Sequence, residues 1–352
     1  MRGRIRQTVS GLPPGAFAFV MAAGILSVGL SRQELVAASR VGLILAGIGW
    51  LVLLFFTAAR ILRYRDRIVA DFHDPHRGFG FFTLVAGTNV LAVRFSDDSP
   101  LVALGLFGFG LVTGLVLAYV VPWTAVLSRA KHPVLSEANG TWFIWVVAMQ
   151  SVATASAGLE PLVSVGRDAL AVVAVVAWSV GIVLYAACAV FVALRLLLYP
   201  LRPRDLDPPY WVAMGAAAIT VVAGAKIVEM TSTPMVDATA GLISGLSVLW
   251  WAWATWLIPL LIAAGVWRHA VHRIPLRYES AWWSIVFPLG MYAVAGMYLG
   301  RADSLPIVER IGAAWLWAAV LAWLFAAAMM VFSWFRPRHG DRHSAEAPGP
   351  AR

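Results

Sequence analysis

Charged residues and cysteine are both scarce in this sequence of 352 residues. Lys, Arg, Asp and Glu make up 13% of it and hydrophobic residues 61%, so the chain cannot cover itself with the polar surface of a soluble globular domain. The one cysteine, Cys188, lies in an apolar run, where it cannot form an internal disulfide or supply a metal cluster, and redox chemistry has no support. The composition indicates an integral membrane protein.

Histidine is missing from every long apolar run, since all seven histidines lie between these runs or near the C-terminus. A Ser–His–Asp triad therefore cannot form at membrane depth, and a membrane-embedded enzyme, the main rival class, lacks converging acids and bases. His73-x-x-His76 and His269-x-x-His272 have spacings that suit a metal, but both lie in arginine-rich connections where polar residues are ordinary. We predict no enzymatic activity, no metal site and no cofactor.

Ten apolar runs are long enough to cross a hydrocarbon layer of roughly 30 Å as helices. They cover residues 13–31, 41–60, 78–95, 101–123, 140–159, 169–194, 210–231, 240–266, 281–300 and 311–335. We predict one all-α integral membrane domain over residues 1–335, followed by a polar cytoplasmic tail, 336–352, that is disordered. Met1–Gln7 mimics the start of a signal peptide, but Pro13 and Pro14 open the following run, and we expect the segment to be retained.

Lys and Arg are unevenly divided between the two sides of these spans. With the N-terminus inside, the inner segments hold 20 of them and the outer segments 7, whereas Asp and Glu divide nine and nine. This is the bias that the positive-inside rule describes. It predicts a multi-pass protein of the plasma (inner) membrane with both termini cytoplasmic, and it explains the net charge of +9 without nucleic acid as a partner.

An aromatic residue close to the start of every odd-numbered span marks a repeat. Phe17, Phe81, Trp142, Trp211 and Trp282 are separated by 64, 61, 69 and 71 residues, which indicates a helical hairpin used five times in the same orientation. Odd spans contain polar or helix-weakening residues, whereas even spans are almost uniformly apolar. We therefore predict an inner ring of odd helices around a central pore, with the even helices outside against lipid. A mere scaffold has no reason to keep a polar interior.

Two sets of residues in the odd spans are candidates for the pore. The candidate pore-lining residues are Phe17, Thr83, Gly87, Asn89, Thr141 and Gln150. For Asn89 and Gln150, as for Thr88, hydrogen bonding between helices is an equally good explanation. In the ninth span, Pro288 lacks an N–H and crowds the carbonyl of Ser284, and Gly290 follows. Phe287 at this kink is a candidate pore gate, and an ordinary packing kink is the alternative.

Three ionisable residues lie toward the outer ends of their spans. Lys226 and Glu229 are three residues apart, a spacing that allows a mutual pair on one helix face. They are candidates for anion selectivity or proton coupling, and a salt bridge near the outer interface is the alternative. Arg94 ends the third span and is a further candidate, facing the outer vestibule or the lipid headgroups.

The stretches Leu12–Leu30, Phe79–Phe95 and Trp282–Tyr292, taken with the ten spans, resemble a known family. They are similar to bacterial tellurite-resistance/C4-dicarboxylate transporters, whose relatives include plant slow-type anion channels and fungal sulfite and malate transporters. The resemblance implies a homotrimer with a pore in each subunit, lined by five inner helices and closed by a phenylalanine that matches Phe287. It implies passage of small anions: chloride, nitrate, sulfite, tellurite or C4-dicarboxylates. Whether the path is a channel or a proton-coupled carrier stays open, and the expected partners are these anions and the lipid bilayer.

Overall fold

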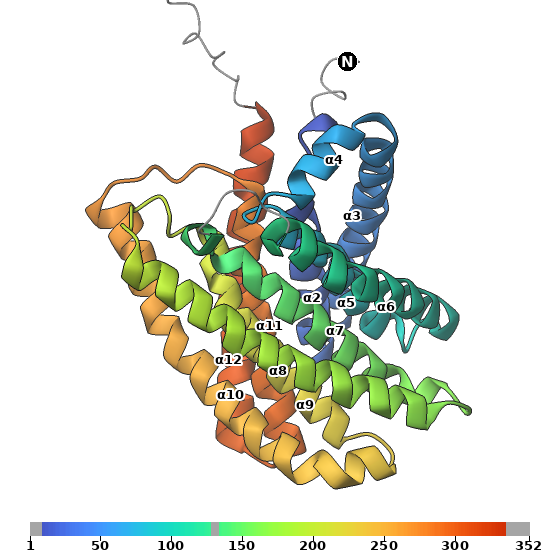
Figure 1. The fold of residues 1–352 in the computed structure, drawn as a ribbon. Helices are drawn as coiled ribbons and strands as arrows, with labels where there is room; N and C mark the ends of the chain where they lie inside the picture. Colours follow the sequence, from blue (N-terminus) through green and yellow to red (C-terminus); the bar gives the residue numbers. More distant parts are fainter. Residues whose placement is uncertain (1–8, 128–133, 336–352) are drawn as a thin grey trace, which may run out of the picture.

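The computed structural model describes residues 9–127 and 134–335, and this part of the chain contains helices and no strand. Ten helical spans in the described residues, each an α-helix with any short turn of helix continuous with it, are long and apolar enough to cross a membrane, which confirms the predicted all-α membrane fold (Figure 1). Their α-helices are α2 (Ala18–Arg32), α3 (Val36–Arg63), α5 (Phe82–Phe95), α6 (Pro100–Pro122), α7 (Phe143–Leu159), α8 (Arg167–Leu198), α9 (Val212–Val228), α10 (Pro234–Val266), α11 (Trp283–Ala302) and α12 (Pro306–Phe335). A short helix, α4 (Arg65–Phe72), follows α3. The predicted tail, 336–352, and the segment Met1–Gln7 lie outside the described residues.

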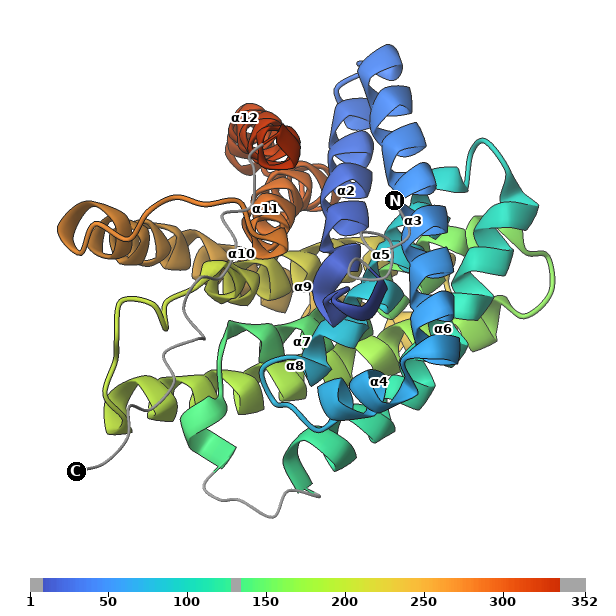
Figure 2. The same ribbon diagram turned by 90° about the horizontal axis from the view of Figure 1, so that it is seen from above.

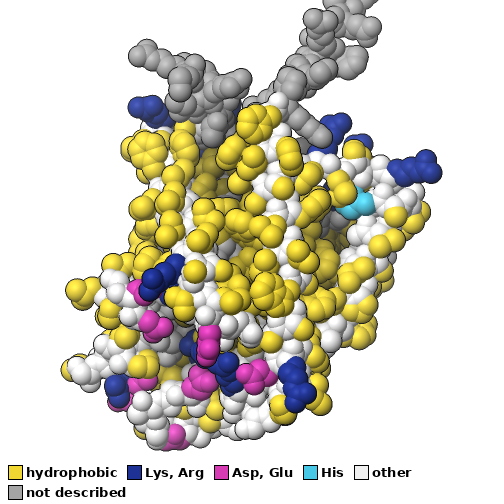
Figure 3. All heavy atoms as spheres, turned by 180° about the vertical axis from the view of Figure 1, so that it is seen from behind, with side chains coloured by type: hydrophobic (Ala, Val, Ile, Leu, Met, Phe, Trp, Pro, Cys, Tyr) yellow, Lys and Arg dark blue, Asp and Glu magenta, His cyan; other side chains and the backbone are white. Residues whose placement is uncertain are grey.

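The ten helices alternate between buried and exposed along the chain. Between 72% and 94% of the residues are buried in the apolar windows of α2, α5, α7, α9 and α11, against 11% to 33% in those of α3, α6, α8, α10 and α12. We call the first five the inner helices and the others the outer helices. The outer helices expose large apolar side chains, as lipid-facing helices do. Figure 3 shows hydrophobic side chains across the middle of one face and charged ones toward its ends.

Packing between the helices follows a regular order. Each inner helix packs against the outer helix that follows it in the chain. The inner helices pack on one another in the order α2, α5, α7, α9, α11 and back to α2, an arrangement that Figure 2 views from above. Glycines let them approach closely, because a Cβ at Gly24 of α2 would lie only 2.6 Å from Val90 Cγ1 of α5.

Every inner helix is preceded by a 3-10 turn that ends in an aromatic residue. The turns are Pro14–Phe17, Gly78–Phe81, Gly140–Trp142, Pro208–Trp211 and Ser280–Trp282, so the aromatic repeat in the sequence coincides with a repeat of local structure. The turns pack in the same cyclic order as the helices, which places all five helix starts at one end of the molecule. We call it the basic end, because the segments there hold 11 of the 18 Lys and Arg residues that the structure describes, and we call the opposite end the far end.

The contact between two of these turns leaves no room for a side chain. A Cβ on Gly140 would overlap the Pro209 carbonyl carbon and the Tyr210 amide nitrogen, which are backbone atoms. We expect Gly140→Ala to lower the free energy of unfolding by about 1–3 kcal/mol, the usual cost of overpacking. Thermal unfolding of the purified protein in detergent measures this loss. Gly245→Ala on α10 is the matched control, since nothing lies within 4 Å of a Cβ there; equal losses in both variants would contradict the contact.

Candidate functional site

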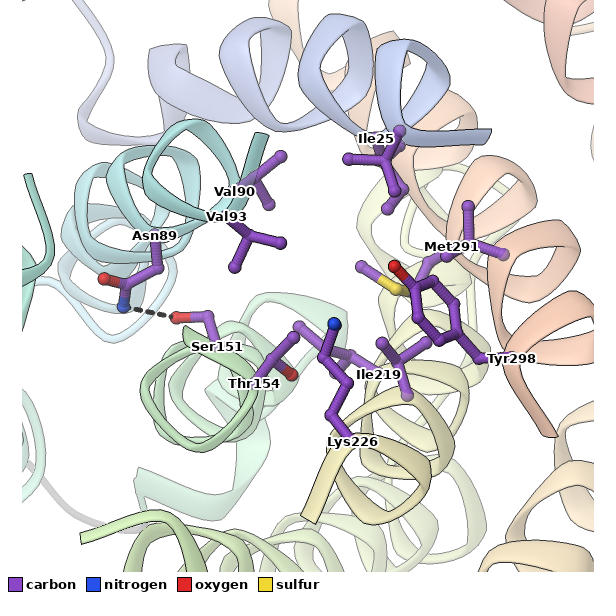
Figure 4. Close-up of a pocket in the computed structure, with 13 residues that line it drawn as sticks. Ile25, Asn89, Val90, Val93, Ser151, Thr154, Ile219, Lys226, Met291 and Tyr298 are labelled. Atoms are coloured by element: carbon purple, nitrogen blue, oxygen red, sulfur yellow. Dashed lines mark hydrogen bonds between the residues drawn. The ribbon is translucent and has the colours of Figure 1, made fainter. Parts of the chain in front are cut away.

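A narrow cavity lies between the five inner helices, and we call it the axial cavity. Its volume is about 30 Å³, and every inner helix contributes to its wall (Figure 4). The lining residues are Ile25, Val28, Asn89, Val90, Val93, Ser151, Thr154, Ile219, Val222, Lys226, Met291, Val294 and Tyr298. Because one water molecule needs roughly 10–15 Å³ of such volume, the cavity has room for about two waters.

Most of this wall is aliphatic, and the hydroxyl groups of Ser151 and Thr154 are already committed. Ser151 donates to a carbonyl of its own helix at 2.7 Å and accepts a hydrogen bond from Asn89 Nδ2 at 2.9 Å, drawn as a dashed line in Figure 4. Thr154 donates to a carbonyl of the same helix at 2.8 Å. Lys226 has no hydrogen-bond or ion-pair partner among the described residues, and Figure 4 shows its ammonium group pointing into the space between the helices. The cavity thus offers an anion one positive charge in a mostly aliphatic wall.

Phe287 lies on the cavity-facing side of α11, one helical turn closer to the basic end. Three residues of α11 line the cavity, Met291, Val294 and Tyr298. Phe287 precedes them by 4, 7 and 11 residues, which is the spacing of a single helix face. Its side chain is 1% exposed. The candidate gate residue is therefore in line with the cavity and displaced along the axis by about 5.4 Å, the rise of one turn.

The predicted kink residues next to the candidate gate pack between helices. α11 stays helical through Pro288. A Cβ added at Gly215 of α9 would lie only 2.9 Å from Pro288 Cγ, so α9 and α11 approach closely here. A Cβ on Gly290 would lie 2.8 Å from Ile25 Cγ2, so this glycine permits the close approach of α2 and α11. Ser284, one turn before the proline, is buried. Proline and glycine here fit α11 closely against both neighbouring inner helices.

One of the six predicted pore-lining residues, Asn89, lines the axial cavity. Two others connect segments at the basic end. Thr83 donates to the Pro14 carbonyl at 3.2 Å, and Thr141 donates to the His76 carbonyl at 3.3 Å. These two hydroxyls connect the segments around the helix starts.

The remaining three face neighbouring helices and not the axial cavity. Gln150 donates to the Trp178 carbonyl of α8 at 3.1 Å. A Cβ on Gly87 would lie 3.3 Å from Val20 of α2, and Phe17 is buried in an apolar cluster with residues of α3. None of these three residues lines the axial cavity, and a place for them elsewhere along the path stays a prediction. Polar and small residues of inner helices also satisfy contacts with other helices where no water reaches.

Four of the five inner helices carry a basic residue in their last turn, at the far end. These residues are Arg32, Arg94, Lys226 and Arg301. Arg94 is ion-paired with Asp98 at 3.0 Å and also donates to Ser27 Oγ at 3.0 Å, so the donors that its predicted vestibule role requires are largely occupied. Arg301 is ion-paired with Glu309 of α12 at 2.7 Å.

Lys226 and Glu229 do not form the pair that their spacing allows. Glu229 is exposed, and no ion pair joins the two in the described part of the chain. The Lys226 ammonium instead lies 4.8 Å from the centroid of the Tyr298 ring, and the Arg32 guanidinium carbon lies 4.0 Å from the same centroid. The salt-bridge interpretation is therefore wrong. Tyr298 could have been found from its spacing to Phe287, whereas nothing in the sequence pattern pointed to Arg32.

A second, polar cavity lies at the basic end, between the α8–α9 and α10–α11 connections. Its volume is about 440 Å³, and its wall includes Arg204, Asp207, Arg268 and Arg277 but no described residue of α2, α5 or α7. Asp207 Oδ1 is buried with no hydrogen-bond partner among the described residues. Burial raises the pKa of Asp207 to about 7, although Arg268 opposes the shift. The positive charge of this cavity therefore falls as the pH rises through neutrality.

The two histidine pairs make contacts within the connections. His76 Nδ1 lies 2.7 Å from Asn139 Nδ2, and His269 Nδ1 lies 2.8 Å from the Ile274 carbonyl oxygen. Over residues 9–127 and 134–335, no group of three or more His, Cys, Asp or Glu side chains is placed to hold a metal ion. The described residues therefore give no donor set from which metal chemistry could be argued.

Comparison with known proteins places this arrangement among anion-transporting membrane proteins. The family model described as voltage-dependent anion channel matches residues 11–331. An uncharacterized membrane protein of Mycobacterium tuberculosis is 61% identical over 140 residues, which are 40% of this chain and 71% of the relative. An uncharacterized transporter of Methanocaldococcus jannaschii is 24% identical over 322 residues, 88% of this chain and 90% of the relative. A sulfite efflux pump of Arthroderma benhamiae is 21% identical over 349 residues, 92% of this chain and 91% of the relative.

Proposed function

Because the chain belongs to the voltage-dependent anion channel family, a family of anion channels and transporters and not of enzymes, we propose that it moves small anions through a path along the axis of its inner helices. An anion cannot cross hydrocarbon unaided, since the cost of removing its water is prohibitive. The axial cavity is the observation that carries the proposal. All five buried helices line it, and an ammonium group without a counter-ion among the described residues lies in it.

Phe287 is the proposed gate of this path. Its ring shares a helix face with the cavity-lining residues of α11 and is buried one turn nearer the basic end. An apolar ring in a narrow passage closes it by excluding water, and a change of its rotamer reopens it. The small volume of the cavity agrees with a closed state of the path, because about two waters are too few to hydrate a passing anion.

The orientation of the inner helices supports anion entry from the basic end. All five begin there, so the partly positive ends of their dipoles point the same way. The basic connections add a longer-range attraction that salt screens. We place this end in the cytoplasm on the positive-inside bias, with both termini cytoplasmic and the protein in the plasma (inner) membrane. A homotrimer with one path in each subunit follows from the family resemblance.

Small inorganic anions are the proposed substrates, with sulfite among them because one relative is named a sulfite efflux pump. Tellurite and C4-dicarboxylates are the other candidates that the resemblance implies. The alternative mechanism is a proton-coupled carrier. The described residues that line the axial cavity include no Asp, Glu or His side chain that could relay a proton. A downhill channel therefore fits the site better.

Flux from liposomes that contain the purified protein tests this function. Chloride, nitrate, sulfite, malate and tellurite are each loaded on one side, with and without an imposed voltage or pH gradient. We expect downhill flux that responds to voltage and that empty liposomes lack. Uphill movement driven by a proton gradient would establish the carrier instead, and no flux of any of these anions under either gradient would refute anion transport by this chain.

A further inference from the structure

The far end of the axial path poses an electrostatic problem for an anion. The five inner helices all end there, and the C-terminal ends of helices carry partial negative charge. An anion that arrives from the basic end, or one that enters from the far end, meets this repulsion unless fixed positive charge offsets it. Basic residues in the last turns of four inner helices provide such charge.

These four basic residues fall into two classes. Arg94 and Arg301 are each neutralised by a carboxylate, from Asp98 and Glu309. Arg32 and Lys226 have no carboxylate partner among the described residues, and both contact Tyr298. Favourable placement at a helix C-terminus explains why all four positions are basic, but it does not explain why two of them are left unpaired.

The ring of Tyr298 contacts both of the unpaired basic residues, Arg32 and Lys226. The Arg32 guanidinium carbon and the Lys226 ammonium nitrogen lie 4.0 Å and 4.8 Å from its ring centroid. The two charges are thus within about 9 Å of each other, close to one Debye length at physiological ionic strength, and they repel. A cation–π contact fixes the position of a cation but carries no net negative charge, so both keep their full charge for another partner.

From this arrangement, and resting on the proposed function, we infer that Lys226, Arg32 and Tyr298 form a binding site for a small inorganic anion at the far end of the axial path. The anion supplies the counter-charge that no described carboxylate provides, in a region where an unpaired charge is costly. Lys226 packs against Gly158 of α7, where a Cβ would make an ordinary van der Waals contact with Nζ at 3.5 Å. The cavity volume favours a small inorganic anion over a C4-dicarboxylate.

Nitrate is the probe for the first test, and thermal unfolding of the detergent-purified protein is the readout. At constant ionic strength, replacement of gluconate by nitrate is expected to raise the melting temperature of the parent saturably, since a ligand that binds the folded state stabilises it. Lys226→Met and Arg32→Gln should each raise the half-saturating nitrate concentration about tenfold, as when one of two charges that hold an ion is lost. Lys226→Arg should keep the half-saturating nitrate concentration close to the parental value. Succinate should raise the melting temperature of the parent much less than nitrate does.

Arg301→Met is the matched control, because it removes a cation at the same end that already has a partner. Suppose that Lys226→Met, Arg32→Gln and Arg301→Met lose stability equally and that none changes the nitrate dependence. Lys226 and Arg32 would then only stabilise the helix ends, and the inference would be overturned. An equal effect of succinate would overturn the small-anion assignment. Nitrate binding that needs Lys226, found together with no flux in liposomes, would leave this site standing and refute the proposed function. Should Lys226→Met fail to fold, Arg32→Gln and Lys226→Arg decide the same question.

Discussion

Liposomes that contain the Phe287→Ala variant are expected to pass anions at least about tenfold faster than liposomes with the parent protein, which corresponds to a barrier lower by about 1.4 kcal/mol. The reason is that the ring lies in line with the axial cavity, one turn along the same face of α11. Alanine removes the ring and is expected to lengthen the cavity toward the basic end. A wetted passage lets an anion keep more of its water, and conduction no longer depends on a rotamer change.

Phe332→Ala is the matched control for this substitution. Phe332 is 65% exposed on the lipid-facing side of α12, so its truncation leaves the inner helices untouched. Both variants are compared with the parent for melting temperature and for assembly state, because loss of a buried ring also destabilises a protein by about 3–5 kcal/mol. A correctly assembled Phe287→Ala protein with parental flux would remove this residue from the gate. Equal gains in both variants would point to a leak at the lipid boundary.

The alternation of inner and outer helices could be predicted from the sequence because it is a property of whole segments. A helix such as α3, with Ile44, Leu51 and Phe55 among its exposed residues, is stable against lipid, and its composition shows this. The aromatic repeat was equally visible, since each inner helix begins with the same local turn. Both signals are local in sequence, and neither depends on knowing which helices become neighbours.

The direction of individual side chains could not be predicted in the same way. Gln150 and Asn89 are both polar residues of inner helices, yet one donates to α8 and the other lines the axial cavity. The difference depends on the rotation of each helix, which packing against its neighbours fixes. Lys226 shows the same limit, because its spacing to Glu229 suggested a partner, whereas the fold brings Tyr298 of another helix to it.

Phe287 itself gives the exception, since one known position on α11 fixes the rotation of that helix. Steps of 4, 7 and 11 residues from it reach Met291, Val294 and Tyr298, and all three line the cavity. A single correct assignment would thus have predicted the α11 wall of the site. The walls contributed by the other four helices needed the structure.

The second large effect expected is a block of the path at Val222, and it tests the route of the anion separately from the gate. Val222 lines the axial cavity from α9, is 3% exposed, and lies one turn before Lys226. Phenylalanine at this position adds four carbon atoms to a space with room for about two waters. In the Phe287→Ala background, Val222→Phe is expected to return anion flux to the parental level or below it, a loss of about tenfold or more.

The same substitution on a lipid-facing helix provides the control. Val248 of α10 is 40% exposed, so Val248→Phe adds an equal volume where no anion passes and should keep the high flux of the Phe287→Ala background. Because overpacking itself costs about 1–3 kcal/mol, each double variant must first show a folded, assembled protein by size-exclusion chromatography. High flux that persists in a folded Phe287→Ala, Val222→Phe protein would mean that anions bypass the axial cavity. The inner helices would then enclose only a packing defect, and the five-helix path would have to be abandoned.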